Sequence, residues 1–481
     1  MKKIWVLLLA MFSAWGLWAQ TPQGLSFDDA LSMMTDGNPA LRAAKYEELA
    51  ARRERQAAAG LFSPVLSVGG SYAYMSQDIV FDLDLNDYKQ NVQAGLGQLL
   101  PALDPQLQQA LGGLLGPLMG QSWEYAYTIQ PRQLGFVGGS VKMPLFMGGK
   151  INAAYRAAKI GEQSAREQTA QTRNALVSEL VERYFGYALA LQAAEVRKQA
   201  VEGVRKHLAD AVAMEREGMI TESERLYVEF KLAETERELQ DTEMQLKTLR
   251  AALDNTLGTG SCGTPLTPLF VLDAIEPLDY FQQLAEMCSP LLNQVTYKQQ
   301  LAHENVRARR AEFFPQVAAV AGGTIGRWQV AELVPNWAVG VGVNFTLFDG
   351  LRREHEYAAA KQTERRVGAL REQAGEGVSV LVESLYNTML NCRDRLASIE
   401  SSMAFAESYL ASKDRAFREG MCASTEMIDA ELNLAKVRIE RMQAAYQYDV
   451  ALAKLLEAAG VSERFADYMH SGSASSVRFN P

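Results

Sequence analysis

Apolar residues alternate with small or polar ones along four segments of the chain, at about 62–75, 133–146, 314–328 and 336–348, least clearly in the third. In the fourth segment the alternation is strict, and the apolar positions are Trp337, Val339, Val341, Val343, Phe345 and Leu347. This pattern predicts β-strands with one apolar face. At about ten residues or more, each strand can cross a bilayer as a tilted barrel strand. Half of a soluble β-sandwich is the alternative, but four strands in two distant hairpins cannot close their own edges.

Two stretches without proline, 148–216 and 350–418, predict one very long helix each. At the standard rise, such a helix is about 100 Å long. A second helix is predicted to run back after each, over 221–257 and 424–459. Apolar residues recur every seven positions in both return helices, which predicts coiled-coil seams. They are Leu232, Leu239, Leu246 and Leu253 in the first, and Leu432, Ile439 and Tyr446 in the second.

The order helix, strand, strand, long helix, return helix occurs twice, and the sequence itself is duplicated. Arg216–Met219 returns 202 residues later as Arg418–Met421. A second constant offset, of 251 residues, links Pro39–Leu41 to Pro290–Leu292. The two offsets differ by 49, so the first copy carries an insertion of that length, which we place at about 77–123. The expected segments are a first repeat over 20–258, an equatorial linker over 259–275, a second repeat over 276–460 and a C-terminal tail over 461–481, disordered from Ser471.

Residues 1–19 predict a secretory signal peptide, because Lys2 and Lys3 precede a short apolar run and a small residue precedes Gln20. A retained N-terminal anchor is the less favoured alternative. After this segment the sequence contains no run of about 18 apolar residues, so no transmembrane helix is predicted. The exported chain is therefore expected to be either soluble or a β-barrel. The net charge of −9 argues against a nucleic-acid partner.

Four cysteines in 481 residues do not predict a disulfide scaffold. Cys262 and Cys288 flank one irregular segment, and they either pair or remain buried thiols. Cys392 and Cys422 are expected about 40 Å apart along the long helices, too far to pair. We expect no catalytic constellation, no metal site and no phosphate-binding loop, and hence neither a cofactor nor an enzymatic activity.

The predicted elements make this a mixed α and β membrane protein. Short membrane strands combined with long antiparallel helices predict a tube. Four strands per chain leave open edges, which closed rotational symmetry would fill. Two chains would give an eight-stranded barrel too narrow for an aqueous channel, whereas three chains give twelve strands.

The chain resembles the TolC-like outer-membrane efflux proteins over nearly all of Leu25 to Gly460. The order, duplication and spacing of several short strings carry this resemblance: Asn38–Leu41, Pro64, Leu347–Gly350, Gly218–Thr221 and Gly420–Met421. The resemblance implies a homotrimer with a twelve-stranded outer-membrane barrel and a helical periplasmic tunnel. It also implies a passive exit duct for small molecules, ions or proteins, served by a periplasmic adaptor and an inner-membrane pump. The alternative is a soluble periplasmic coiled-coil adaptor.

The helix tips are the first candidate functional residues. Gly218 and Gly420 lie where each long helix must reverse, and glycine accepts positive φ at a helix end. The resemblance implies that these glycines, with Met219 and Met421, contact the adaptor at the periplasmic mouth.

Acidic residues near the tips are the second candidates. Glu426 and Asp429 lie three residues apart on one helical face, and Glu224 is the repeat counterpart of Glu426. The resemblance implies an acidic ring at the periplasmic entrance, which would attract cations; the alternative is a solvated charged face. Some relatives brace the closed entrance with an arginine where this chain has Cys422.

The insertion at about 77–123 is expected in the outer loop between the first two strands. The acidic segment from Asp82 to Asp87 fails the spacing of a calcium loop and is interpreted as a solvated turn. The leucine-rich segment that follows is expected to pack over the barrel mouth or against the outer leaflet.

Overall fold

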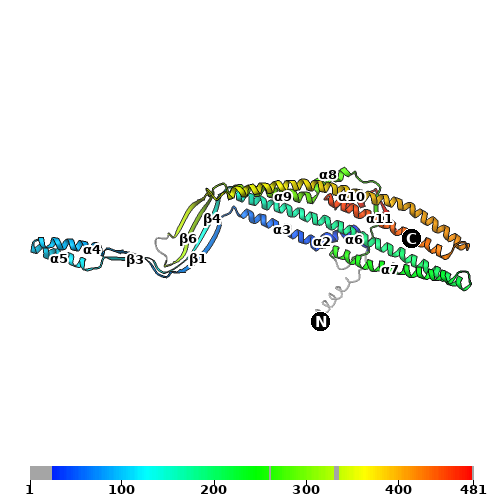
Figure 1. Ribbon diagram of the computed structural model, residues 1–481, viewed down its shortest axis with the longest axis horizontal. Coiled ribbons are helices and arrows are strands. Elements are labelled where there is room, and N and C mark those ends of the chain that lie inside the picture. Colours follow the sequence, from blue (N-terminus) through cyan, green and yellow to red (C-terminus); the bar gives the residue numbers. More distant parts are fainter. Residues whose placement is uncertain (1–23, 259–261, 330–334, 479–481) are drawn as a thin grey trace, which may run out of the picture. The chain divides into compact units, whose positions relative to one another are not determined.

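The computed structural model describes residues 24–258, 262–329 and 335–478, so the expected signal peptide over 1–19 lies outside the described residues. Figure 1 labels many of the helices and strands named below. The chain divides into two units. Unit 1 comprises Met1–Gln56, Tyr155–Val306 and Ala358–Pro481, and unit 2 comprises Ala57–Ala154 and Arg307–Tyr357. Long helices run through both units, and each unit is described by itself below.

The helices reproduce the internal duplication. In the first repeat they are α2 (Phe27–Gly37), α3 (Pro39–Gly60), α6 (Lys150–Arg216) and α7 (Glu222–Leu257). In the second they are α8 (Leu278–Cys288), α9 (Pro290–Ala311), α10 (Arg352–Arg418) and α11 (Ser424–Ala458). Both ends of α2 and α3 recur at the longer repeat offset in α8 and α9, and both ends of α6 recur at the shorter offset in α10. Three of these four helix pairs therefore begin and end at equivalent residues, and α7 and α11 begin at equivalent residues.

Unit 2 contains a four-stranded antiparallel sheet in the order β1-β4-β6-β7. Its strands are β1 (Val65–Tyr74), β4 (Gln133–Met147), β6 (Gln316–Trp328) and β7 (Trp337–Asn344). The register places Leu66 opposite Val141, and Ala321 opposite both Val141 and Val339, which gives one face an apolar row. On the other face the same three pairings join Ser67, Ser140, Gly322 and Ala338.

The insertion departs from the expected turn. It contains β2 (Ile79–Asp84), α4 (Asn86–Leu99), the 3-10 turn η1 (Leu100–Ala102), α5 (Pro105–Gly120) and β3 (Glu124–Gln130). Asp82 and Asp84, interpreted above as part of a solvated turn, lie in β2 and pair with β3. That interpretation was wrong because the partner strand lies far along the chain, and the local acidic pattern does not reveal it.

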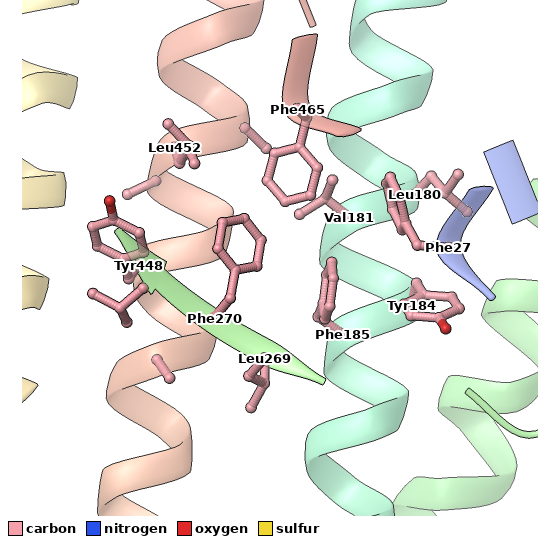
Figure 2. Close-up of a cluster of buried hydrophobic side chains, with 14 of the residues drawn as sticks. Phe27, Leu180, Val181, Tyr184, Phe185, Leu269, Phe270, Tyr448, Leu452 and Phe465 are labelled. Carbon is pink, nitrogen blue, oxygen red and sulfur yellow. The ribbon is translucent and has the colours of Figure 1, made fainter. Parts of the chain in front are cut away.

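Unit 1 has an aromatic core where α6 and α11 meet β5 (Leu269–Leu272) and α12 (Arg464–Met469) (Figure 2). Phe27 stacks on Phe185 with ring centroids 5.5 Å apart, and Phe465 lies 5.6 Å from Phe270. The Tyr184 hydroxyl donates to the Leu25 carbonyl at 2.6 Å and accepts from the Leu266 and Thr267 amides at 3.2 and 3.1 Å. This hydroxyl thereby fixes the N-terminal segment and the linker to α6.

The described part of the C-terminal tail contains a strand where disorder was expected. Residues Ala474–Val477 form β8, which pairs antiparallel with β5 in the linker. The Val477 side chain is buried. The expectation was wrong because the small-residue composition of the tail carries no apolar periodicity, whereas the buried backbone of β5 requires hydrogen-bond partners that β8 supplies.

All four cysteines of the chain lie in unit 1. Cys262, Cys288, Cys392 and Cys422 are all free thiols, so the pairing left open for the first two is not formed.

On α7 a second seven-residue row lies beside the leucine row, and its buried members are Val228, Thr235, Thr242 and Thr256. Guanidinium groups of α6 cross to it, since Arg183 Nη1 donates to Thr256 Oγ1 at 2.6 Å and Arg197 Nη1 donates to Thr242 Oγ1 at 2.5 Å.

Candidate functional site

The candidate site is the pair of hairpin tips in unit 1, where α6 turns into α7 and α10 turns into α11. Gly218 and Gly420 adopt φ of 73° and 72°. In the first tip the Gly218 amide donates to the Glu215 carbonyl at 2.9 Å, and the Met219 amide donates to the Met214 carbonyl at 2.8 Å. The second tip repeats both bonds at the equivalent residues. This pattern is a Schellman motif, which requires a left-handed residue and so accounts for both glycines.

The first tip uses its acidic residue as a helix cap. Thr221 is the N-cap of α7, and its Oγ1 accepts from the Glu224 amide at 3.3 Å. Glu224 Oε2 in turn accepts from the Thr221 amide at 2.9 Å. Because this capping box engages the Glu224 carboxylate with its own backbone, Glu224 contributes to helix initiation.

The second tip has no such cap. Ala423 is the repeat counterpart of Thr221 and has no side chain that can accept a hydrogen bond. The carboxylate of Glu426, the counterpart of Glu224, forms an ion pair with Lys413 Nζ and lies 3.5 Å from Cys422 Sγ. The hydrogen bond from Lys413, with a smaller contribution from Cys422, lowers the pKa of Glu426. Glu426 is therefore an exposed, ionised carboxylate at neutral pH.

Asp429 connects the two hairpins. The Tyr227 hydroxyl on α7 donates to Asp429 Oδ1 on α11 at 3.2 Å. These two residues are repeat counterparts, separated in the sequence by the shorter offset. Burial, and after it the negative charge of Asp429, raises the pKa of Tyr227, so the hydroxyl keeps its proton and its role as donor.

Apolar contacts hold the hairpins together behind the tips. Val204, Ala211, Val228 and Ile428 form a small buried cluster. Beside it, His207 Nε2 lies 3.2 Å from Glu431 Oε2. A pocket of about 300 Å³ separates the two turns, and both hairpins line it. Its lining includes Met214, Met219, Met421 and Cys422.

The structure places Glu426 and Asp429 at the start of α11. Glu224 instead forms the capping box of α7. Met219 and Met421 are exposed at the turns. Sequence reasoning missed Lys413, because its pairing with Glu426 depends on how α10 packs against α11. At the repeat position of Asp429, the first hairpin has Tyr227 in place of a second acid. Its place as the repeat counterpart of Asp429 was the signal that the two could meet.

Membrane-spanning helices and metal-binding clusters are both absent from the described residues. None of the described helices combines the length and hydropathy needed to cross a membrane. No cluster of three or more histidine, cysteine, aspartate or glutamate residues suited to a metal ion occurs in the described part of the chain.

Comparison with known proteins identifies the class. The family model for outer membrane efflux proteins matches residues 121–259 and 282–461, more than half of the chain. The chain therefore belongs to the outer membrane efflux protein family, which confirms the resemblance to TolC-like proteins and decides against the soluble adaptor. The protein is an outer-membrane component of efflux.

Solved structures share the fold at low sequence identity. VceC of Vibrio cholerae is 15% identical with a TM-score of 0.67, and the match covers 90% of this chain and 96% of that chain. CmeC of Campylobacter jejuni is 13% identical with a TM-score of 0.70, covering 92% and 89%. MtrE of Neisseria gonorrhoeae, solved in its open state, is 14% identical with a TM-score of 0.66, covering 91% and 89%. No match was found among curated protein sequences.

Proposed function

We propose that three copies of this chain form a passive exit duct across the outer membrane. In this assembly each chain contributes four strands to a twelve-stranded barrel, and the antiparallel helices of its two repeats, 20–258 and 276–460, contribute to a periplasmic tunnel. Cargo enters from a periplasmic adaptor and an inner-membrane pump. The chain itself performs no chemistry on the cargo.

The four-stranded sheet is the observation that carries this proposal. Within the described residues, β1 and β7 each pair on one side only. Every residue of these two strands is exposed in the single chain, including Leu66, Val68, Val339 and Val341. Open edges and an exposed apolar face are unstable in water, and closure with other copies in a lipid bilayer satisfies both.

The tips support a charged entrance to the duct. Three copies of Glu426 and Asp429 would bring six carboxylates around the tunnel axis. A ring of carboxylates attracts cations and repels anions. We assign the ring to these two residues and leave Glu224 to its helix cap. Gly218, Met219, Gly420 and Met421 remain the proposed contacts for the adaptor, because they form the exposed turns of both hairpins.

Single-channel conductance in planar bilayers tests the proposal. We expect the purified protein to form a cation-selective pore, and the double variant Glu426→Gln/Asp429→Asn to lose most of this selectivity. A matched control is Glu243→Gln, which removes one exposed carboxylate from the middle of α7. The control should conduct like the native protein.

The outcomes separate the duct from its entrance. A pore whose selectivity is unchanged in the double variant would keep the duct and discard the acidic ring. A correctly folded trimer without any conductance would overturn the duct itself.

A further inference from the structure

In unit 2 the insertion extends from the four-stranded sheet as a separate two-stranded ribbon, which carries two helices at its far end. At its base the Met75 amide donates to the Arg132 carbonyl at 2.7 Å, and the Arg132 amide donates to Asp78 Oδ1 at 2.5 Å. The entering and leaving segments therefore lie side by side. Strands β2 and β3 form the ribbon, and α4, η1 and α5 connect their far ends (Figure 1).

One face of the ribbon is apolar and uncovered. Phe81 pairs with Tyr127, and Leu83 pairs with Tyr125, so these four side chains share a face. All four are exposed. The opposite face carries Asp82, Asp84 and Glu124. An isolated two-stranded ribbon is at best marginally stable in water, so this apolar face requires a further surface.

The two helices of the insertion also have apolar side chains that nothing covers in the single chain. No residue of α4 or α5 is buried in the described chain. Residues Leu111, Leu115 and Met119 are half-buried on one side of α5. Beside them, Leu107, Leu114 and Leu118 form an outer stripe whose side chains are 54, 70 and 58% exposed. Spacings of seven and four residues place these three leucines on one face of the helix.

Charge decides what covers this stripe. Between residues 78 and 124 the only basic side chain is Lys89, while the carboxylates are Asp78, Asp82, Asp84, Asp87, Asp104 and Glu124. Helices that lie on an anionic lipid surface use lysine and arginine on their polar face, which this segment lacks. The leucine stripe itself contains no charge, so a copy of the same stripe can approach it without electrostatic cost.

We infer that the insertions of the three copies pack on one another, with the α5 leucine stripes turned toward a common threefold axis. This inference rests on the trimer of the proposed function. The three ribbons rise from neighbouring segments of a closed barrel, and closed symmetry lets each copy bury the same stripe. Six residues of β2 span about 20 Å at 3.3 Å per residue. That length keeps the helices away from the exit and leaves openings between the ribbons.

Cysteine cross-linking of the full-length protein in outer membranes tests this contact. Leu114→Cys is placed in a Cys422→Ser background, which removes the thiol at the hairpin turn, and a short bis-maleimide is added. We expect a covalent dimer band. Gln109→Cys is the matched control, because Gln109 lies on the opposite side of α5 and is also exposed. It should remain monomeric after denaturation.

A second variant tests the packing without any new thiol. Leu107→Ser/Leu114→Ser/Leu118→Ser should lower the temperature at which the trimer dissociates in detergent. If the trimer is intact by light scattering but neither cysteine variant cross-links, the contact between insertions is refuted and the duct stands. Equal cross-linking of both cysteine variants would refute the claim that the leucine stripe forms the contact. Loss of the trimer in the native protein would overturn the inference and the proposed assembly together.

Discussion

At the scale of single residues, one substitution between the repeats separates a cap from an exposed charge. Thr221 and Ala423 occupy equivalent positions, and each is followed three residues later by a glutamate. In the first tip the threonine and Glu224 form a capping box. In the second tip alanine cannot take part, so Glu426 pairs with Lys413 instead. One difference between two equivalent turns therefore gives two different carboxylate environments.

Ala423→Thr should rebuild the missing capping box and withdraw Glu426 from Lys413. An N-cap threonine stabilises a helix by about 1 kcal/mol relative to alanine. We expect hydrogen exchange of the first-turn amides of α11 to slow by about fivefold, and the cation selectivity of the pore to fall. Ala423→Val is the control, because valine has a similar shape but no oxygen. Faster exchange in the threonine variant than in the native protein would contradict the cap.

The pH dependence of the entrance follows from Lys413. The pKa of Glu426 is lowered from its usual 4.5, chiefly by the Lys413 hydrogen bond. A carboxyl with a lowered pKa keeps its charge, and its share of stability, above pH 4.5, and loses both only as the pH falls through the lower folded value. Lys413→Met removes the cause, so cation selectivity should be lost at a higher pH, closer to 4.5.

Selectivity measured between pH 3 and 7 checks this shift. Lys436→Met removes an exposed lysine further along α11 and serves as the control. Identical pH profiles for the native protein and the Lys413 variant would show that Lys413 does not set the charge of Glu426. Little change in thermal stability is expected, because exposed ion pairs contribute little.

At the scale of elements, the two copies share their helix boundaries because they share their terminators. Gly148, Gly218 and Gly258 adopt positive φ, and so do their repeat counterparts Gly350, Gly420 and Gly460. Each marks a point where the chain enters or leaves a helix. The boundaries of the long helices are therefore encoded locally, by residues that tolerate a left-handed backbone.

The same substitution should have opposite effects at two glycines of the second repeat. Gly420→Ala forces a side chain into the left-handed region, which costs about 1–2 kcal/mol. Gly377→Ala lies inside α10 with open space around it, and should stabilise the helix by about 0.5–1 kcal/mol. Thermal unfolding and hydrogen exchange of the tip amides measure both. A stabilising effect at Gly420 would refute the Schellman turn.

At the scale of the whole molecule, the single chain leaves surfaces that only an assembly can cover. In the part of the chain that the structure describes, the sheet of unit 2 has two open edges and an exposed apolar face, and the insertion has its leucine stripe. In unit 1, by contrast, the aromatic core is buried within a single chain. The exposed surfaces of unit 2 are therefore those where we expect lipid and further copies.

The two faces of β7 should respond differently to a charge. Val341 lies on the apolar face, and a positive charge on a lipid-facing barrel residue costs about 2–4 kcal/mol near the bilayer midplane. Val341→Arg should therefore reduce the yield of membrane-inserted trimer. Ala338→Arg places the same charge on the opposite face of the same strand and should be tolerated. Equal insertion of both variants would contradict the proposed orientation of the sheet.

Much of the fold could be predicted because it is encoded in local or repeated patterns. The strict alternation around Val341 predicts a strand, the seven-residue spacing of Leu232 to Leu253 predicts a seam, and the duplication predicts equivalent elements in both halves. Pairing between distant segments could not be predicted in the same way. Strand β8 has no apolar periodicity, and β2 requires a partner strand far along the chain.

By itself, the sequence determined the duplication, the long helices, the alternating strands and the turns at Gly218 and Gly420, because each depends on neighbouring residues or on a repeat offset. Only the tertiary structure decided which side chains meet at the tips. Glu224 turns to its own cap, Glu426 to Lys413, and Asp429 to Tyr227 of the other hairpin. These pairings depend on how helices far apart in sequence pack together, and the residue types alone do not specify that packing.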